Sequence, residues 1–370
     1  NRSLIRAARD IAEFSKSSDD SLASIQFAEE KIYSISATQD TSAMKDIREG
    51  SGIDAVLDKF EKLAKDKDAF KGVTTGFTRL DRLTNGLQKS DLIVIAARPG
   101  MGKTSIAMNI IENAALGSGA VCAVFSLEMP EVQIIQRLMC SAANVSMSDA
   151  LSGKLTANDW KKLVKASEKL RKSRINIDDS SRVTPAEILS KCRRIKAKNN
   201  GQLDLVMIDY IQLMSSGKTQ NGDQNRTQEV ASITRDLKIM AKELDVPVIA
   251  LSQLRRIQSG EPQLSDLRES GAIEQDADIV MFINRPDVNA TDEDIEKKHI
   301  IKGMADLIVA KHRNGGLDRI KLRFKGELTK FVNPERDEGM EPPPENDLPM
   351  PENLSGMVAE DIPPDEEMPF

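Results

Sequence analysis

Residues 98–105 combine the residue types that bind a phosphate group, in the order Arg98, Pro99, Gly100, Met101, Gly102, Lys103, Thr104 and Ser105. An apolar, β-branched run precedes this segment, and a stretch that favours a helix follows it. In such a unit, glycines let backbone N–H groups point at an anion, and the helix N-terminus adds partial positive charge. Lys103 would then reach the β- and γ-phosphates of a nucleotide, and the Thr104 hydroxyl would bind Mg²⁺. The flanking strand and helix argue against the alternative, an ordinary turn with a surface lysine.

Three further polar side chains follow predicted strands. Asp209 ends an apolar strand, as does the aspartate that holds the Mg²⁺ shell in phosphate-loop proteins. Glu128 lies just past the strand that follows the phosphate-loop helix, where a carboxylate can polarise an attacking water molecule. Gln253 ends a later strand, where its amide can donate to the γ-phosphate. Taken singly, Glu128 and Gln253 are better explained as polar strand ends, whereas Asp209 together with the phosphate loop indicates a nucleotide site.

Two cations, Lys311 and Arg313, occupy alternate positions at the end of another predicted strand. Alternation in a strand puts both side chains on the same face. An arginine delivered to the phosphates of a neighbouring subunit is the arginine-finger arrangement. The alternative is a solvated basic turn.

An alternation of strands and helices from residue 73 onward must position these side chains. It predicts an α/β fold with a doubly wound, mostly parallel sheet that binds its ligand at the carboxyl ends of the strands. The expected strands are 92–97, 120–126, 175–178, 203–213, 246–251, 279–284 and 307–311, with helices at 75–83, 105–111, 130–142, 156–172, 184–198 and 227–244 and a terminal hairpin at 318–332. Two polar loops, 215–225 and 255–265, either reach for nucleic acid or are mobile surface loops.

The segment before this sheet is helical in pattern. Apolar residues at helical spacing predict two helices within 2–36, so that residues 1–38 form a helical hairpin. Such a hairpin is too small to be stable alone, and its apolar face needs a partner. Residues 39–70 form a linker with one amphipathic helix at 53–63, which packs either on its own domain or on a neighbouring subunit.

Length and composition restrict the class of protein. The 370 residues are 39% apolar and contain no membrane-spanning run and no N-terminal signal segment, so a soluble protein is expected. The three cysteines lack CxxC spacing, which argues against disulfides and structural zinc and fits a reducing cytosol. Because the first residue is Asn1, the sequence is expected to be a fragment or a trimmed chain.

The net charge of −6 hides two opposed regions. Residues 334–370 carry 12 acidic side chains and one arginine, so the preceding 333 residues carry a net charge of +5. This tail also holds nine of the 15 prolines, a composition typical of disorder. A mildly basic body is compatible with nucleic-acid binding.

Several strings together resemble the motif series of the DnaB-type replicative DNA helicases, in order and with compatible spacing, across residues 1–333. They are ARPGMGKTS, VFSLEMP, IDDSS, LVMIDYIQLM, MAKELDVPVIALSQL, SDLRESGAIEQDAD and AKHRNG. The chain departs from the general GxxxxGK[ST] pattern because Ala97 replaces the first glycine, but members of this family also begin the loop with alanine.

The resemblance implies a RecA-like ATPase domain over residues 71–333 that assembles into a ring of six and binds ATP with Mg²⁺ between subunits. One subunit would supply the phosphate loop together with Glu128, Asp209 and Gln253. The adjacent subunit would supply Lys311 and Arg313.

The resemblance also implies single-stranded DNA in the central channel, contacted at its phosphates by Arg268, Glu269 and Gly271. The helix at 53–63 then resembles the family's linker helix, and the hairpin at 1–38 resembles the end of the N-terminal region. The globular N-terminal domain is not part of this sequence, so primase recruitment is in question, and a helicase loader is a further expected partner.

The last residues of the acidic tail, which finish in Met368, Pro369 and Phe370, are similar to the tip of bacterial single-stranded-DNA-binding proteins. A terminal carboxylate beside an aromatic ring can be captured by a basic, apolar pocket. The sequence therefore predicts recruitment of proteins that bind that tip, with a solubilising tail, or one that competes with DNA for the channel, as alternatives.

These observations predict a bacterial, cytoplasmic, ATP-driven replicative DNA helicase without a membrane partner. The alternative within the same fold is a RecA-class recombination or branch-migration ATPase. An ATP-binding module that does not hydrolyse its nucleotide is disfavoured by Glu128.

Overall fold

The computed structural model describes residues 2–17, 21–39, 53–54, 56–57, 60–61, 71–215, 224–254, 260–267, 270–288 and 301–334. The chain divides into two compact units, Asn1–Phe70 and Lys71–Phe370. Most of the polar loop 215–225, half of the loop 255–265 and the tail beyond residue 334 lie outside the described residues.

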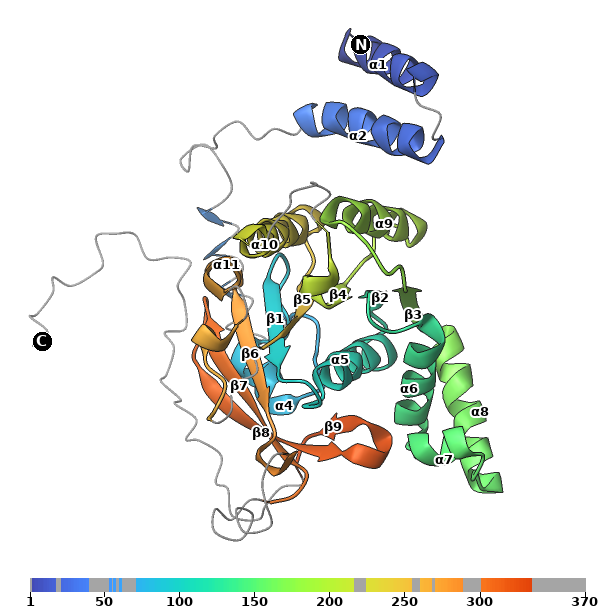
Figure 1. Cartoon of the computed structure of the whole chain (residues 1–370), viewed down its shortest axis with the longest axis vertical. Coiled ribbons are helices and arrows are strands. Elements are labelled where there is room, and N and C mark those ends of the chain that lie inside the picture. Colours follow the sequence, from blue (N-terminus) through green and yellow to red (C-terminus); the bar gives the residue numbers. More distant parts are fainter. Residues whose placement is uncertain are drawn as a thin grey trace, which may run out of the picture. The chain divides into compact units, whose positions relative to one another are not determined.

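The first unit contains the two helices expected from apolar spacing, α1 (Arg2–Ser17) and α2 (Ser21–Gln39) (Figure 1). The rings of Phe14 and Phe27 stack with centroids 4.3 Å apart, so an aromatic pair joins the two helices. The described residues between 53 and 61 are helical, and the apolar ones among them expose about half of their surface or more. The remainder of the predicted helix at 53–63 lies outside the described residues.

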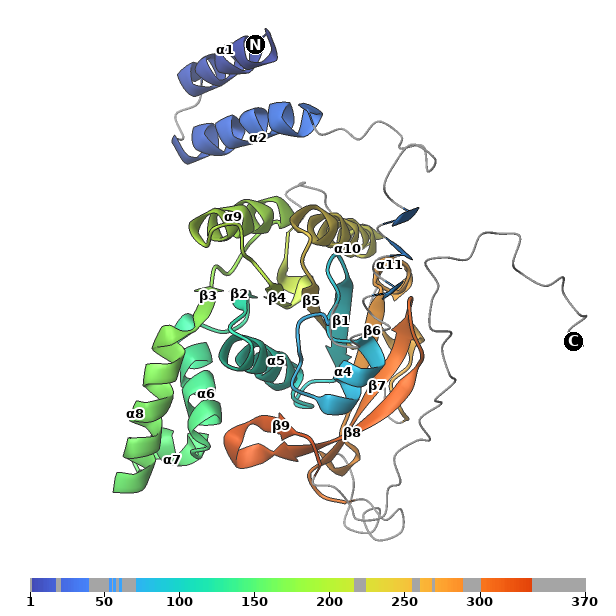
Figure 2. The same cartoon turned by 180° about the vertical axis from the view of Figure 1, so that it is seen from behind.

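The second unit is built on one nine-stranded sheet with the strand order β3-β2-β4-β5-β1-β6-β7-β8-β9 (Figures 1 and 2). Neighbouring strands from β3 to β6 run parallel, and β7, β8 and β9 are added antiparallel. The expected α/β fold with a mostly parallel sheet is therefore confirmed. The strands are β1 (Leu92–Ala97), β2 (Val121–Ser126), β3 (Arg174–Asp178), β4 (Leu205–Asp209), β5 (Val248–Gln253), β6 (Ile279–Asn284), β7 (Met304–His312), β8 (Asp318–Lys325) and β9 (Lys330–Val332).

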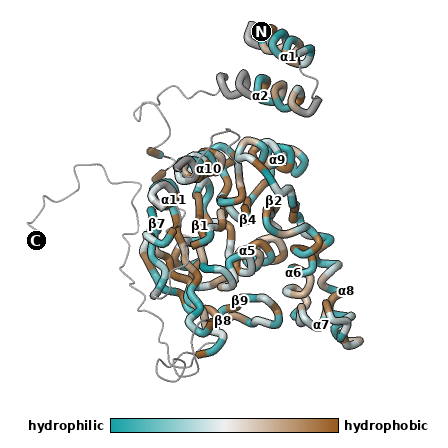
Figure 3. The backbone as a smooth tube through the Cα atoms, viewed as in Figure 1, coloured by the Kyte–Doolittle hydropathy of each residue, from teal (hydrophilic) through white to brown (hydrophobic). Residues whose placement is uncertain are grey.

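Helices cover both faces of this sheet because the strand residues are apolar on both sides. Residues at alternate positions of β1 enter two different cores: Ile93 and Ile95 join one, and Leu92 and Val94 join the other. Figure 3 shows hydrophobic residues concentrated along the strands between the two helical layers. The helices are α4 (Thr78–Thr84), α5 (Lys103–Gly117), α6 (Glu131–Ala143), α7 (Met147–Ser152), α8 (Ala157–Lys172), α9 (Pro185–Lys198), α10 (Gln224–Leu244) and α11 (Ser270–Asp276).

Besides shifted ends of several elements, the structure differs from the sequence-based expectation at three places. The strand predicted at 203–213 covers only Leu205–Asp209, and Ile211–Leu213 form a short 3₁₀ turn. Ile211 is buried in the core on one face of the sheet without strand pairing, so its apolar character extended the predicted strand too far. Helices α7 and α11 were not predicted, because their six and seven residues are too few to display a period.

Candidate functional site

The phosphate loop joins the buried strand β1 to the helix α5 at the carboxyl edge of the parallel sheet. Its glycines at 100 and 102 have φ values of 78° and 96°, in the left-handed region that favours glycine. A Cβ atom at Gly102 would lie 2.9 Å from the ring of Phe331, so the loop also packs closely on the C-terminal hairpin. Both glycines are therefore required by the backbone, as the sequence pattern indicates.

Lys103, Thr104 and Asp209 meet at this edge. The Lys103 Nζ atom lies 3.3 Å from Asp209 Oδ1, and the Thr104 hydroxyl donates a hydrogen bond to Asp209 Oδ2 at 2.7 Å. Burial lowers the pKa of the Lys103 ammonium, and the carboxylates of Asp209 and Glu128 oppose that shift. The three residues form a compact charged cluster at the start of α5.

This cluster fits a divalent cation. Asp209 is 1% exposed, and within the described residues its Oδ1 atom accepts no hydrogen bond despite the nearby ammonium. A carboxylate and a hydroxyl are oxygen ligands of the kind that Mg²⁺ takes, with phosphates and water completing the shell. In the part of the chain that the structure describes, no three His, Cys, Asp or Glu side chains cluster as a metal site, so those further ligands have to come from a bound molecule or water.

Strand pairing brings Glu128 and Gln253 to the same edge. Ser126 at the end of β2 pairs with Asp209, and Ala97 at the end of β1 pairs with Gln253. The Glu128 side chain is exposed and Gln253 is half-buried. Both line one cavity with the phosphate loop, so the edge carries a carboxylate and an amide beside the charged cluster.

This cavity has a volume of about 490 Å³. Besides the predicted residues it is lined by residues that the sequence did not single out, namely Met129, Arg137, Arg285, Phe324, Gly326 and Thr329. The Arg285 guanidinium lies 4.1 Å from the centroid of the Phe324 ring, which gives this wall a flat, cationic and aromatic surface. Of these six residues, only Arg285 had a sequence feature that could have pointed to the site, because it directly follows β6.

Lys311 and Arg313 lie at the opposite edge of the sheet from the phosphate loop, level with the amino ends of the parallel strands. Because β7 is antiparallel to β6, His312 pairs with Ile279 at the start of β6, whereas the phosphate loop leaves the sheet level with Ile283. Four residues of strand therefore separate the two groups, about 13 Å along the sheet. Neither cation is brought to the phosphate loop of its own subunit.

The two cations differ in their surroundings. The Lys311 ammonium donates hydrogen bonds to the carbonyls of Glu274, Gln275 and Ala277 at 2.5, 3.3 and 2.7 Å, which fixes it to the end of α11. The Arg313 side chain is 56% exposed, and its Nη1 atom lies 3.4 Å from Asp278 Oδ1. Arg313 is thus the more accessible of the two.

The chain's relatives agree with the motif series and the fold. A family model described as the DnaB-like helicase C-terminal domain matches residues 72–333. The chain belongs to this family. The replicative DNA helicase DnaB of Geobacillus stearothermophilus is 42% identical over 350 residues, which span 92% of this chain and 74% of the relative. DnaB of Haemophilus influenzae is 43% identical over 343 residues, spanning 90% of this chain and 71% of the relative.

Solved structures of family members give the same result. An ATPase domain with 40% sequence identity matches with a TM-score of 0.71 and covers 78% of this chain and all of that chain. A DnaB-like replicative helicase, solved to describe its interactions with primase, is 36% identical and matches with a TM-score of 0.75. The match covers 90% of this chain and 76% of that chain. These relatives confirm the predicted replicative helicase and the ATP-driven enzyme, and they do not favour a recombination ATPase.

The predicted DNA-binding residues are described only in part. Gly271 is exposed in the first turn of α11, while Arg268 and Glu269 lie outside the described residues. Gly271 lies in the first turn of the same short helix whose last carbonyls bind Lys311, so Gly271 is one short helix away from the basic pair. Among the helices that the structure describes, none is both long and apolar enough to cross a membrane.

Proposed function

We propose that this chain is the motor of a ring-shaped replicative DNA helicase in which each nucleotide lies between two subunits. One observation carries the proposal: the phosphate loop and Arg313 lie at opposite edges of one sheet. Each edge supplies half of a nucleotide site. One subunit cannot bring both its phosphate loop and its Arg313 to the same nucleotide. A head-to-tail interface that closes into a ring completes every site, and six subunits are expected from the family.

The nucleotide in this proposal is ATP with Mg²⁺, bound by residues 98–105. Lys103 transfers its contact from Asp209 to the β- and γ-phosphates, while the Thr104 hydroxyl and Asp209 hold the cation, which neutralises charge that develops on the phosphates. Glu128 accepts a proton from the attacking water, and Gln253 orients that water and the γ-phosphate. Lys311 and Arg313 of the adjacent subunit stabilise the transferred phosphoryl group.

Single-stranded DNA is the proposed track, bound through its phosphates by Arg268, Glu269 and Gly271. Contacts to phosphates carry no sequence information, which suits a motor that must step along any sequence. Primase and a helicase loader are proposed partners; a solved relative was studied for its interactions with primase. A bacterial, cytoplasmic location is proposed from the similarity to the replicative helicases of bacteria.

The proposed domain organisation is a helical hairpin at 1–38, a linker at 39–70, the ATPase domain at 71–333 and an acidic tail at 334–370. The helix at 53–63 is proposed to dock on a neighbouring subunit. The exposed apolar side chains among its described residues support this, because such side chains gain from burial.

Strand displacement on a forked DNA substrate tests the proposed function. The full chain should separate the strands only with ATP and Mg²⁺, and its mass in the presence of ATP and single-stranded DNA should be that of a hexamer. Lys103→Ala is the matched control and should neither hydrolyse ATP nor separate the DNA strands. DNA-stimulated hydrolysis without any strand separation would point instead to a recombination ATPase.

The acidic tail is proposed to recruit proteins that bind the tip of single-stranded-DNA-binding protein. Its end, Met368-Pro369-Phe370, supplies the free carboxylate and the ring that such a pocket captures. Deleting these three residues and measuring binding to such a partner tests the idea. Unchanged affinity would leave only a solubilising or DNA-competing tail.

A further inference from the structure

Helix α8 carries an exposed face that is both basic and apolar. Its buried residues, Leu163 and Ala166, join a small core with Ala143 of α6, so the helix turns one side toward α6. The residues on the opposite side share helical spacing and are exposed. We call them the basic face of α8, and they are Trp160, Lys161, Val164, Lys165, Arg171 and Lys172. Trp160 exposes 59% of its surface and Val164 exposes 54%.

Within the described part of the chain, the charges of this face have no partners. The ammonium groups of Lys161, Lys165 and Lys172 and the guanidinium of Arg171 make no hydrogen bond or ion pair with any described residue. Helical spacing adds only one acidic side chain to the face, that of Glu168. Four cations beside an exposed tryptophan are suited to an occupant that is acidic and partly apolar.

The chain itself contains a segment of that composition in its acidic tail. Residues 359–370 carry five acidic side chains and no basic one, interspersed with the apolar side chains of Ile362, Met368 and Phe370. The whole tail has 12 acids for one arginine, whereas the preceding residues are basic overall. Charge complementarity therefore directs this segment toward basic surface of the same chain.

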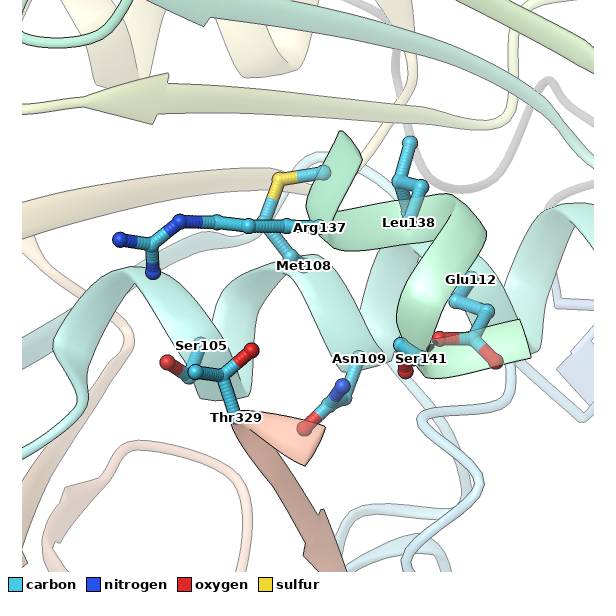
Figure 4. A pocket seen from close by; sticks show the side chains of 8 residues that line it. All are labelled: Ser105, Met108, Asn109, Glu112, Arg137, Leu138, Ser141 and Thr329. Atoms are coloured by element: carbon cyan, nitrogen blue, oxygen red, sulfur yellow. Dashed lines mark hydrogen bonds between the residues drawn. The ribbon is translucent and has the colours of Figure 1, made fainter. Parts of the chain in front are cut away.

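The last strand before the tail is held beside α6, the helix on which α8 packs. The Lys330 ammonium of β9 donates to Glu112 of α5 at 2.8 Å and to the carbonyl of Ser141 of α6 at 3.2 Å. The Ser141 hydroxyl donates to the same carboxylate, and Figure 4 shows these two side chains facing each other. Helix α8 lies on the outer side of α6 (Figures 1 and 2). The tail thus follows a strand that only α6 separates from α8.

We propose that residues 359–370 dock on the basic face of α8 of their own subunit. The acidic side chains pair with its cations, and the apolar side chains cover Trp160 and Val164. The 36 residues after residue 334 can span about 120 Å when extended, and a domain of this size has a radius of gyration of only about 18 Å, so the tail can reach the face. A partner protein that binds Met368 to Phe370 then has to displace the segment from α8.

The fluorescence of Trp160 tests this docking, because it is the only tryptophan of the chain. In the full chain, the docked tail should shield Trp160 from the neutral quencher acrylamide. Deleting residues 359–370 should increase quenching and shift the emission to longer wavelength. A synthetic peptide of residues 359–370, added to the truncated chain, should reverse both changes. The same peptide with each Asp replaced by Asn and each Glu by Gln should have no effect.

Two double variants test whether the basic face is the docking site. Lys161→Gln/Lys165→Gln removes two exposed charges, so the fold should be unaffected. The Kd of the peptide for the truncated chain should rise about fivefold, as for the loss of two exposed ion pairs. Lys162→Gln/Lys169→Gln is the matched control, because it removes the same charge from exposed positions of α8 outside this face. This control should bind the peptide normally.

The remaining outcomes each decide the inference. Equal quenching of Trp160 in the full and truncated chains, with no response to the peptide, would overturn it. Equal weakening by both double variants would mean diffuse attraction without a docking site. Shielding that depends on protein concentration would assign the tail to a neighbouring subunit. If a single-stranded oligonucleotide shields Trp160 and the peptide does not, the face binds nucleic acid instead. Lys103→Ala should dock its tail normally, so the result does not depend on the proposed function.

Discussion

Replacing Arg313 with alanine tests whether each nucleotide site is shared between subunits. The side chain is 56% exposed, so losing its contact with Asp278 at 3.4 Å should destabilise the fold by less than about 1 kcal/mol. Asp278 keeps its other partners, because the Lys238 ammonium and the backbone N–H of Leu92 still donate to it. A finger that stabilises the phosphoryl group contributes about 10³-fold to 10⁵-fold to kcat. Hydrolysis should therefore collapse while nucleotide binding is preserved.

Mixing two inactive variants then distinguishes action in the neighbouring subunit from action in the same one. Arg313→Ala retains an intact phosphate loop, and Lys103→Ala retains an intact finger. In rings assembled at random from equal amounts, about a quarter of head-to-tail interfaces combine the two intact halves. Phosphate release should accordingly recover to about a quarter of the wild-type rate per site, although each variant alone is inactive.

The control for this mixing experiment is a pair of variants damaged on the same side of the interface. Lys103→Ala mixed with Glu128→Gln offers no complete site and should remain inactive. If the mixture that contains Arg313→Ala also stays inactive in rings of hexameric mass, Arg313 does not act across the interface. Full hydrolysis by Arg313→Ala alone would refute the finger assignment as well.

Three further changes have defined outcomes. Glu128→Gln should bind nucleotide normally and slow phosphate release by about 10²-fold or more, and a normal rate would mean that another group activates the water. Asp278→Ala should lower the free energy of unfolding in urea by about 3–5 kcal/mol, because Lys238, with a side chain 14% exposed, loses its carboxylate. Burial, with a contribution from Asp278, raises the pKa of Asp91 from 3.8 to about 6. Protonation of Asp91 therefore favours the folded state, and stability should fall as the pH rises from about 4 to about 6. Asp91→Asn should abolish that fall in thermal denaturation followed across this pH range.

The parts of the site that could be predicted from sequence are those encoded by short, local sequence patterns. The phosphate loop can be recognised because glycine, lysine and threonine lie between a predicted strand and a predicted helix. Asp209 could be predicted because it ends an entirely apolar run in a chain that also contains the phosphate loop. In both cases the chemistry and the element that positions it lie within about ten residues of each other, so pattern and backbone reinforce each other.

The remaining features depend on long-range pairing that no local pattern records. Arg137 and Arg285 look like any arginine beside a helix or strand until the sheet order brings α6, β6 and the terminal hairpin around one cavity. The separation of Arg313 from its own phosphate loop follows from the antiparallel register of β7 on β6. Register is set by the burial of whole strands, which a single sequence window cannot reveal.

The strand β1 has a mechanical consequence. It runs from Leu92, whose backbone N–H donates to the Asp278 carboxylate at 2.8 Å, to Ala97, where the phosphate loop begins. All six residues are buried, and the strand is paired on both sides, so its length of about 16 Å is effectively fixed. In the proposed ring, each domain would then act as a rigid lever with a nucleotide contact at either end. A change at one contact would tilt the whole domain, so the proposed ring would move by rotation of its subunits against one another.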